Sequence, residues 1–314
     1  MKAKNCLIFG GSGQIGRNLI RKLTKNNYKV TVVTRNIHQK SYMIKTQANA
    51  GYIEIVEANI FDEEKIRILF KKADICINLI GILYETKKGN TFKNIHTLFP
   101  SLLAKLSKVY NLKHFIHLSA LGVHEAIDSN YAKSKLEGEE RISKNFPLAM
   151  IIRPSIVYSI DDNFTTRFMS LMNLLPVFPL YYNGKTKFAP IFCSDLTEII
   201  LKVVKNNIKG ELIECVGPEE LTFKEILKIL SSLLEKNRFM LPMPLFMAKM
   251  SATILQNFPK PLLTIDQLKL LKYDSIKTGK NKTNIDFEIN CNSYFEKEVG
   301  NYCYMWKTGG EYSK

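Results

Sequence analysis

The sequence predicts an α/β protein in which a doubly wound parallel sheet is followed by a smaller, mostly helical C-terminal lobe. Strand and helix patterns alternate through the first half, a glycine-rich turn follows the first strand, and prolines cluster after Pro154, where the alternation stops. Strands separated by helices are typical of βαβ units, which build parallel sheets. We therefore expect a sheet domain over residues 1–154 and a lobe over 155–314 whose segments interleave with it.

Each element of the first half is predicted from its side-chain pattern. Apolar, β-branched runs predict strands, and apolar residues at helical spacing predict helices. The expected strands are Asn5–Phe9, Lys29–Thr34, Tyr52–Val56, Ile75–Ile80, His114–Ser119 and Ala149–Arg153. The expected helices are Gln14–Lys25, a helix that Asp62 caps and that runs to Lys71, Thr91–Tyr110 and Asn130–Asn145.

The second half predicts shorter elements. The expected helices are Asp195–Val204, Thr222–Glu235 and, roughly, Leu245–Gln256, and the expected strands are Phe188–Phe192 and Glu211–Val216. Asp161 and Asp162 are interpreted as a helix cap, and Asp195 as the cap of the helix that it opens, because aspartate is a preferred N-cap residue.

Charge pattern and cysteine content argue against a nucleic-acid partner and against a metal site. The chain has 45 Lys and Arg against 29 Asp and Glu, a formal net charge of +16. Its lysines are spread out, with no basic tract that interleaves with aromatics, so we expect a solvated basic surface and no nucleic-acid partner. The six cysteines are scattered without a CxxC pair, which predicts a reducing compartment and no metal site.

The sequence also contains no recognisable export or membrane-spanning signal. The residues Met1 to Asn5 lead directly into an apolar strand, without an apolar signal region or a small-residue cleavage site. No uncharged apolar run reaches the length of about 18 residues that a spanning helix needs. We therefore expect a protein that is not secreted and has no transmembrane helix.

The stretch FGGSGQIG, residues Phe9–Gly16, is the first candidate site. Gly10, Gly13 and Gly16 have the spacing G-x-x-G-x-x-G between a predicted strand and a predicted helix. Glycine allows a backbone to approach a ligand closely, and the amides of a helix start attract a pyrophosphate. This context favours a dinucleotide cradle over the alternative, a tight turn that selects glycine for its own geometry.

The end of the second strand indicates which dinucleotide is bound. NAD-preferring sites place an acidic residue there, on the ribose hydroxyls. This chain has Thr34 followed by Arg35, and a guanidinium suits a 2′-phosphate. The sequence favours NADP(H), with NAD(H) as the alternative cofactor. Arg35 could also be a surface residue that contacts no ligand.

Tyr131 and Lys135 stand four residues apart in YAKSK, so a helix would place both on one face. A lysine beside a phenol lowers the pKa of the phenol and can also hold a nicotinamide ribose. The tyrosine could then exchange a proton with a carbonyl during hydride transfer, with the Ser119 hydroxyl on the same carbonyl oxygen. Ser119, Tyr131 and Lys135 are therefore the candidate catalytic residues; the alternative is that Tyr131 and Lys135 only hold the ribose.

Motifs in a fixed order connect these sites to a known superfamily. They are GGSGQIG (residues 10–16), NLIG (Asn78–Gly81), HLSALG (His117–Gly122), YAKSK (residues 131–135) and RPSIVY (Arg153–Tyr158). The chain resembles the extended and atypical short-chain dehydrogenases/reductases.

Longer segments narrow the resemblance to one branch of that superfamily. It contains the nucleotide-binding accessory subunit of respiratory complex I (NADH:ubiquinone oxidoreductase, alpha-subcomplex subunit nine family) and its bacterial relatives. The similar segments are Ile77–Gly81, Phe146–Phe168, Gly184–Ile200 and Leu263–Ser275. The resemblance covers residue 4 to about 275 and does not extend beyond about Ile276.

The resemblance implies a Rossmann-like fold with a bound NADPH and assigns it a set of contacts. It implies that the pyrophosphate lies over Gly10, Ser12, Gly13, Gln14 and Ile15, and that Gly16 also belongs to the cofactor site. It implies that Arg35 binds the 2′-phosphate and that Asn59 and Ile60 flank the adenine. The ribose would lie at Leu79, Ile80 and Gly81, and the nicotinamide side at Tyr131, Lys135 and Pro154. Two departures stand out. Ala58-Asn59 replaces a common Gly-Asp, which loses a charge, and Tyr158-Ser159 replaces a common Tyr-Gly.

Three hypotheses about function follow. The resemblance implies an accessory or assembly protein of complex I, peripheral on the inner membrane in a bacterial cytoplasm or a mitochondrial-matrix-like compartment, with tightly held NADPH that serves structure. The retained Ser119, Tyr131 and Lys135 support the second, an active NADPH-dependent oxidoreductase or epimerase on an unknown substrate linked to ubiquinone biosynthesis. The third is a nucleotide-sensing regulator.

The stretch Phe239–Leu263 leaves two interpretations open. It contains four methionines, several large apolar residues and, as its charges, only two lysines. It is either a core helix of the small lobe or an amphipathic surface that meets a membrane or a hydrophobic partner.

Overall fold

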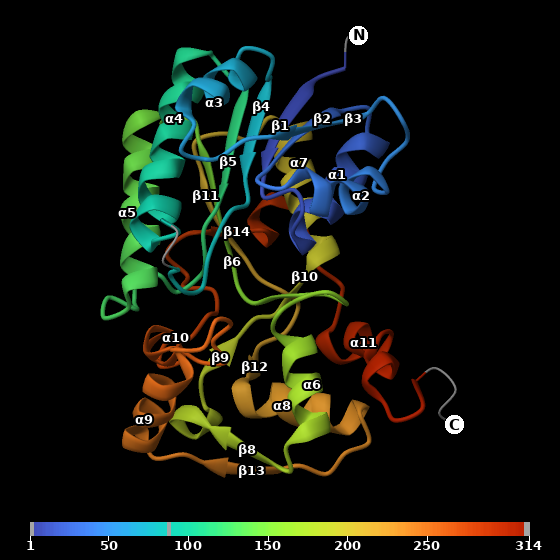
Figure 1. The fold of residues 1–314 in the computed structure, drawn as a ribbon, viewed down its shortest axis with the longest axis vertical. Coiled ribbons are helices and arrows are strands. Elements are labelled where there is room, and N and C mark those ends of the chain that lie inside the picture. The colour runs from blue at the N-terminus through green and yellow to red at the C-terminus, as the bar shows by residue number, and fades with distance from the viewer. Residues whose placement is uncertain (1–2, 87–88, 311–314) are drawn as a thin grey trace. The chain divides into compact units, whose positions relative to one another are not determined.

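The structure, a computed structural model, describes residues 3–86 and 89–310, which divide into two compact units (Figure 1). The first unit comprises residues 1–120, 134–153 and 193–214. The second comprises residues 121–133, 154–192 and 215–314. Among the described residues, no helix has both the length and the apolar character needed to cross a bilayer.

The first unit is built on a twisted sheet whose strands run parallel. Its strands are β1 (Asn5–Phe9), β2 (Lys29–Thr34), β3 (Ile53–Glu57), β4 (Ile75–Asn78), β5 (His114–Leu118), β6 (Met150–Pro154) and β11 (Leu212–Cys215). They lie in the order β11-β6-β5-β4-β1-β2-β3, seven strands of an eight-stranded sheet. The five pairings from β3 to β6 are all parallel. The strand order reverses between β1 and β4, which is where open α/β sheets bind ligands.

Helices cover both faces of this sheet. They are α1 (Gln14–Lys25), α2 (Ile37–Lys45), α3 (Glu63–Phe70), η1 (Lys93–Leu98), α4 (Phe99–Val109), α5 (Asn130–Asn145) and α7 (Cys193–Lys205). Figure 1 shows α3, α4 and α5 on one face and α1, α2 and α7 on the other. The confirmed fold class is therefore a Rossmann-like doubly wound α/β sheet.

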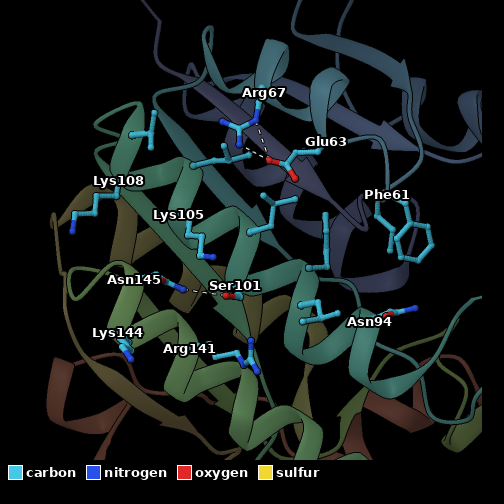
Figure 2. A pocket seen from close by; sticks show the side chains of 16 residues that line it. Phe61, Glu63, Arg67, Asn94, Ser101, Lys105, Lys108, Arg141, Lys144 and Asn145 are labelled. Carbon is cyan, nitrogen blue, oxygen red and sulfur yellow. Dashed lines mark hydrogen bonds and ion pairs between the residues drawn. The ribbon is translucent and has the colours of Figure 1, made fainter.

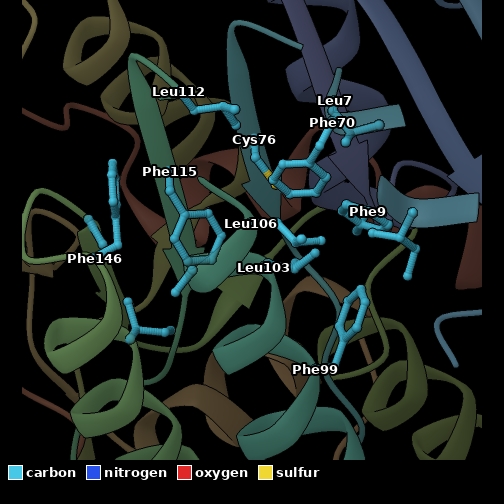
Figure 3. Close-up of a cluster of buried hydrophobic side chains, with 14 of the residues drawn as sticks. Leu7, Phe9, Phe70, Cys76, Phe99, Leu103, Leu106, Leu112, Phe115 and Phe146 are labelled. Atoms are coloured by element: carbon cyan, nitrogen blue, oxygen red, sulfur yellow. The ribbon is translucent and has the colours of Figure 1, made fainter. Parts of the chain in front are cut away.

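A cluster of buried apolar side chains joins α3, α4 and α5 to the sheet (Figure 3). Phe9 of β1 and Phe99 of α4 meet edge to face, with ring centroids 5.2 Å apart. Leu103 and Phe115 are completely buried beside them. Burying one such side chain contributes about 1.5–3 kcal/mol, so this cluster fixes the strand ends from which the candidate site is built.

The second unit combines short strands with helices. Its elements are β7 (Val157–Tyr158), α6 (Thr165–Leu174), β8 (Val177–Leu180), η2 (Tyr181–Gly184), β9 (Lys187–Phe188), β10 (Ile191–Phe192), β12 (Leu221–Thr222), α8 (Phe223–Leu233), β13 (Phe239–Pro242), α9 (Leu245–Leu255), α10 (Ile265–Leu270), β14 (Lys282–Thr283), η3 (Ile285–Phe287), α11 (Phe295–Gly300) and η4 (Cys303–Trp306). Its core packs Tyr158 against Phe295, with ring centroids 4.9 Å apart.

The structure decides between the two interpretations of Phe239–Leu263. On α9 only the small Ala248 and Ala252 are buried. Most large side chains of the segment are exposed, among them Phe239 at 73% and Phe246 at 71%, whereas Leu263 is buried. The segment is therefore an apolar surface of the second unit, and the interpretation as a core helix is wrong.

Two predicted elements are divided by proline. The single strand expected over Phe188–Phe192 is wrong: the structure has β9 and β10, because Pro190 has no amide to continue a ladder. The single helix expected over Thr91–Tyr110 is also divided, into the π-helical η1 and α4. Pro100 lacks the amide that would donate to the His96 carbonyl four residues earlier, so regular α-helical bonding is interrupted there.

The helix-cap predictions have mixed outcomes. Asp62 accepts from the Lys65 amide at 3.0 Å, so its role is confirmed. Asp162 accepts from the Phe164 and Thr166 amides at the start of α6, but the N-cap residue is Phe164. Asp161 accepts from Ser159 Oγ. The expected Asp195 cap is wrong, because α7 already begins at Cys193 and Asp195 lies within its first turn. The helix α2 was not predicted; a weakly amphipathic segment with one buried residue, Ile44, leaves little periodic signal.

Candidate functional site

The glycine-rich loop joins the carboxyl end of β1 to α1. Its chain turns at Gly10, with φ +85°, and the Gly13 amide donates to the Gly10 carbonyl at 3.1 Å. A Cβ at Gly16 would lie 2.5 Å from that carbonyl oxygen, so Gly16 is needed for α1 to pack on the loop. A Cβ at Gly13 would meet nothing closer than 3.5 Å. Because Gly13 also has an ordinary φ of −76°, the fold alone does not require glycine there.

The start of α1 has the character of an anion site. Gly13 is the N-cap and offers no side chain to cap the helix, and the first turn, which opens with Gln14 and Ile15, contains no acidic residue. The Arg17 guanidinium donates to the Ser12 carbonyl at 2.6 Å, which brings a cation to the loop. Burial lowers the pKa of Arg17 from its usual value. No motif in the sequence points to Arg17, although it lies in the first turns of the predicted helix Gln14–Lys25.

The end of β2 has the side chains that the sequence predicts. Thr34 is buried and Arg35 is exposed, with its guanidinium donating to Asn90 Oδ1 at 3.1 Å. Asn36 then caps α2 by accepting from the Gln39 amide. An exposed carboxylate, Glu57, lies opposite Thr34 in the register of β2 and β3.

Asn59 and Ile60 follow β3 and take different roles. Asn59 is exposed, and its Oδ1 accepts from the Phe61 amide at 3.1 Å. Ile60 is buried in the apolar cluster that joins α3, α4 and α5 to the sheet.

The segment after β4 lies against the glycine loop. The Leu79 amide donates to the Phe9 carbonyl at 2.9 Å, and a Cβ at Gly10 would lie 3.0 Å from the Leu79 carbonyl carbon. Asn78 Oδ1 accepts from the Ile80 amide at 3.2 Å. The loop after β1 and residues 79–81 therefore form one edge at the point where the strand order reverses.

A buried polar group continues this edge onto β5. Asn78 Nδ2 donates to His117 Nδ1 at 3.1 Å, so the proton of this imidazole is assigned to Nε2. His117 Nε2 and Ser119 Oγ are both buried and have no hydrogen-bond partner within the described chain. Ser119 directly follows β5, as predicted. These two unpaired groups mark a place where a ligand or water would gain hydrogen bonds.

Lys135 is the buried cation of this edge. Its ammonium donates to the Leu118 carbonyl at 3.1 Å, and a Cβ on Gly81 would lie 3.8 Å from Nζ. Burial lowers the pKa of Lys135 to about 8, and the Glu139 carboxylate opposes that shift. Glu139 itself forms a two-point ion pair with Arg153, both buried. The arginine of the RPSIVY motif therefore holds α5 to β6.

His96 is a second buried imidazole, and it lies beside residues 81–82. Its Nε2 accepts from the Ile82 amide at 3.1 Å, and its Nδ1 is paired with Ser134 Oγ at 3.0 Å. Burial, together with the Lys135 charge, lowers the pKa of His96 to about 2. A neutral His96 therefore supports residues 81–82 from behind. A lone histidine in a helical pattern offers no signal by which it could have been found.

Tyr131 lies in the first turn of α5, which a carboxylate from α10 caps. Asp266 accepts from Ser129 Oγ, from the Asn130 amide and from the Tyr131 amide, at 2.8, 2.8 and 3.0 Å. Burial, and then the Asp266 charge, raises the pKa of the Tyr131 phenol above its usual value. The expected lowering of this pKa is therefore wrong, because burial and the Asp266 carboxylate both raise it.

The two units divide the predicted site residues between them. The first unit contains the glycine loop, Arg35, Asn59, Ile60, residues 79–81, Ser119 and Lys135. The second contains Tyr131 and Pro154. No group of three His, Cys, Asp or Glu side chains is placed to bind a metal ion in the part of the chain that the structure describes.

The buried imidazoles predict a loss of stability in mild acid. Burial lowers the pKa of His96 to about 2 and of His114 to about 4, and holds that of His117 well below its usual 6.5. The unfolded chain takes up these protons as pH falls through 6.5 and the folded chain does not, so stability is lost below pH 6.5. Each of His96 and His117 should cost about 1.4 kcal/mol per pH unit.

Urea unfolding at several pH values between 7.5 and 5 measures this slope. His117→Gln should reduce the slope of the free energy of unfolding against pH by about 1.4 kcal/mol per pH unit, which corresponds to one proton. The control His38→Gln, at an exposed residue, should leave that slope unchanged. A wild-type free energy of unfolding that stays constant down to pH 5 would contradict the assignment of neutral buried imidazoles.

The chain matches a known family model over most of the first unit. The model is described as the NAD dependent epimerase/dehydratase family, and it matches residues 6–215. The structure of this chain is similar to the crystal structure of a Bacillus anthracis dTDP-glucose 4,6-dehydratase in complex with NAD, with a TM-score of 0.70 and 16% sequence identity. The superposition covers 97% of this chain and 96% of the dehydratase. At that identity the structural likeness supports the fold alone.

Two of the proteins with similar sequences have the same name. A Dictyostelium discoideum protein, the mitochondrial NADH dehydrogenase (ubiquinone) 1 alpha subcomplex subunit 9, is 28% identical over 93% of this chain and 82% of its own length. A protein of the same name from Arabidopsis thaliana is 26% identical over 86% of this chain and 70% of its own.

Proposed function

Because the chain belongs to the NAD dependent epimerase/dehydratase family, we propose that it holds one NADP(H) and acts as an accessory component of respiratory complex I. Membership in this family confirms the resemblance to the extended short-chain dehydrogenases/reductases. The further steps, to NADP(H) and to complex I, rest on the site and on the named relatives.

The observation that supports nucleotide binding most is the contrast between the glycines of one loop. Gly10 and Gly16 are held close to other backbone atoms. A Cβ on Gly13, which has an ordinary φ, would make only one ordinary contact, 3.5 Å from the Gly10 oxygen, so there is room beside it. A pyrophosphate that approaches the start of α1 needs that space, and the backbone amides there would donate to it. The unpaired His117 Nε2 and Ser119 Oγ fit the polar end of the same ligand.

The contacts proposed for the nucleotide follow the edge of the sheet. Residues 10–15 would hold the pyrophosphate, Arg35 the 2′-phosphate, Asn59 and Ile60 the adenine, and residues 79–81 the ribose. Lys135, Tyr131 and Pro154 would lie toward the nicotinamide. A bound nicotinamide supplies a hydride donor or acceptor, and an ammonium at Lys135 would hold its ribose by hydrogen bonds.

The complex I part of the proposal is supported by the named relatives and by one surface of the second unit. Two relatives from distant organisms are mitochondrial NADH dehydrogenase (ubiquinone) subunits. The surface of β13 and α9 exposes large apolar side chains such as Phe246 and Ile254. No acidic residue occurs between Lys236 and Ile265. Such a surface suits peripheral attachment at a membrane that carries the complex, in a bacterial cytoplasm or a mitochondrial matrix.

Native mass spectrometry of the protein pulled from its own solubilised membranes tests both parts together. We expect one NADP(H) per chain and co-purified complex I subunits, with the subunits reduced by Phe246→Ser/Ile254→Ser while the nucleotide stays. A protein that is recovered alone with its nucleotide would contradict the complex I role. Partners that bind only when NADPH is added would favour the third hypothesis, a nucleotide-sensing regulator.

Arg35 should decide the choice between the two nicotinamide dinucleotides. Arg35→Ala should weaken NADPH binding at least about tenfold, because a charge-assisted hydrogen bond to the 2′-phosphate is lost, and should leave NADH binding within about twofold. Calorimetric titration of both nucleotides measures this, with Arg21→Ala as the control for removing one exposed arginine. If both nucleotides weaken equally, Arg35 does not contact the 2′-phosphate.

An active NADPH-dependent oxidoreductase or epimerase remains the second candidate, because Ser119, Tyr131 and Lys135 are all retained. The raised pKa of the Tyr131 phenol favours the accessory role. We therefore expect neither wild type nor Tyr131→Phe to oxidise NADPH with carbonyl or quinone acceptors, while both bind it. Wild-type turnover that Tyr131→Phe lowers about 100-fold or more, with binding intact, would establish the enzyme instead.

A further inference from the structure

A groove runs over the outer side of α3, α4 and α5 in the first unit (Figure 2). It has a volume of about 780 Å³, within the range typical of ligand-binding clefts. Of the residues proposed to hold the nucleotide, only Ile60 lines it. The groove is therefore a feature that the nucleotide does not explain.

The groove is strongly basic. Five cations line it, with Glu63 as the one carboxylate in its described lining; the cations are Arg67, Lys105, Lys108, Arg141 and Lys144. Arg67 is paired with Glu63, and Arg141 with Glu137, each within its own helix.

Three lysines of the groove are left without such a counter-charge. Lys105 and Lys108 extend from α4 and Lys144 from α5 (Figure 2). All three are exposed, and none forms an ion pair within residues 3–86 and 89–310. Lys108 and Lys144 lie in the last turns of their helices, where a cation interacts favourably with the helix dipole. Lys105 lies before the last turn, so the dipole does not account for it.

Apolar side chains lie exposed between these charges. Phe61, Leu98 and Val109 line the groove and are 53%, 42% and 63% exposed. Leu98 lies at the end of η1 and Val109 at the end of α4, so apolar surface extends along the groove. A groove with cations beside exposed apolar side chains complements an amphipathic segment that has carboxylates beside its own apolar residues.

We propose that this groove binds an acidic, amphipathic helical segment of another protein. A second copy of this chain is disfavoured, because a two-fold contact would set the same lysines against each other. A small anion is disfavoured, because the three lysines are exposed and spread over two helices. The inference does not depend on the nucleotide proposal, since the groove would bind its partner with or without NADP(H).

A synthetic helical peptide with glutamates on one face and leucines on the other is the probe. Fluorescence anisotropy should show that the full-length protein binds this peptide and that Lys105→Glu/Lys144→Glu weakens it at least about tenfold. The matched control Lys40→Glu/Lys45→Glu changes the net charge equally on exposed residues of α2 and should stay within about twofold. Val109→Ser, which alters no charge, should also weaken binding, and circular dichroism checks that each variant is folded.

Other outcomes overturn the proposal. Failure of the wild-type protein to bind the peptide removes the site, and equal weakening by both double variants indicates diffuse charge attraction. A lysine–leucine peptide that binds as well shows adsorption without charge recognition. A DNA duplex or anionic vesicles that bind more tightly than the peptide, with the same dependence on Lys105 and Lys144, would show that the partner is not a protein.

Discussion

Gly13→Asp should lose NADPH binding at least about 100-fold, since it places a carboxylate where the pyrophosphate must approach the start of α1. The same substitution should leave the fold intact or slightly more stable. Gly13 is the N-cap of α1 with φ −76°, its Cβ would meet only the Gly10 oxygen at 3.5 Å, and aspartate is a preferred N-cap residue. Calorimetric titration with NADPH and a thermal melt of the free protein measure the two effects.

Gly16→Ala is the matched control within the same loop. Its Cβ would lie 2.5 Å from the Gly10 oxygen and from Gly11 Cα, so it should lower stability by about 1–3 kcal/mol through overpacking. Loss of binding without loss of stability is therefore specific to position 13. Wild-type affinity for NADPH in a folded Gly13→Asp protein would rule out this loop as the nucleotide site.

Glu139→Gln should destabilise the protein by about 3–5 kcal/mol, because it leaves the Arg153 guanidinium buried without its counter-charge. Both side chains are almost fully buried, and Glu139 meets Arg153 through two hydrogen bonds. The substitution should also move the pKa of Lys135 further below about 8, since the Glu139 charge opposes the effect of burial. Urea unfolding near neutral pH measures the first effect.

Glu137→Gln on the same helix is the control for the buried pair. It removes an ion pair with Arg141 that is about half exposed, and such a pair contributes about 0–1 kcal/mol. The double variant Glu139→Leu/Arg153→Met should recover much of the stability, because an apolar pair needs no compensation for buried charge. Equal effects of Glu137→Gln and Glu139→Gln would contradict the importance of burial.

The sequence predicts well those features that depend on neighbouring residues. The strand Asn5–Phe9, the glycine loop and the helix Gln14–Lys25 occur where their patterns place them. The Lys29–Thr34 strand also ends where expected, directly before Arg35. Local periodicity, glycine spacing and capping chemistry are sufficient for these features, since each acts over a few residues.

The sequence does not predict features that distant segments create. Asp266 caps α5 from 135 residues away in the chain. Burial of the Tyr131 phenol, and then the Asp266 charge, raise the pKa that was expected to be lowered. His96 acts through Ser134, and Arg153 through Glu139. These contacts depend on which segments the fold brings together, and no spacing in the sequence encodes them.

The two surfaces of the protein described above also depend on tertiary packing, which the sequence does not predict. The composition of Phe239–Leu263 shows that an apolar segment exists, but its exposure depends on which face of α9 packs on the second unit. That face consists of Ala248 and Ala252, two small residues that a hydrophobicity pattern does not distinguish from their larger neighbours. The basic groove is similar, because Lys105 and Lys144 become neighbours only when α4 and α5 pack side by side.

The nucleotide content of the purified protein tests the central claim most directly. Denaturing the protein and identifying the released dinucleotide by mass spectrometry should give about one NADP(H) per chain, restored by added NADPH if purification removes it. Release of NAD(H) alone would contradict the role of Arg35. A folded protein that releases no dinucleotide and binds neither NADPH nor NADH on titration would contradict the account as a whole.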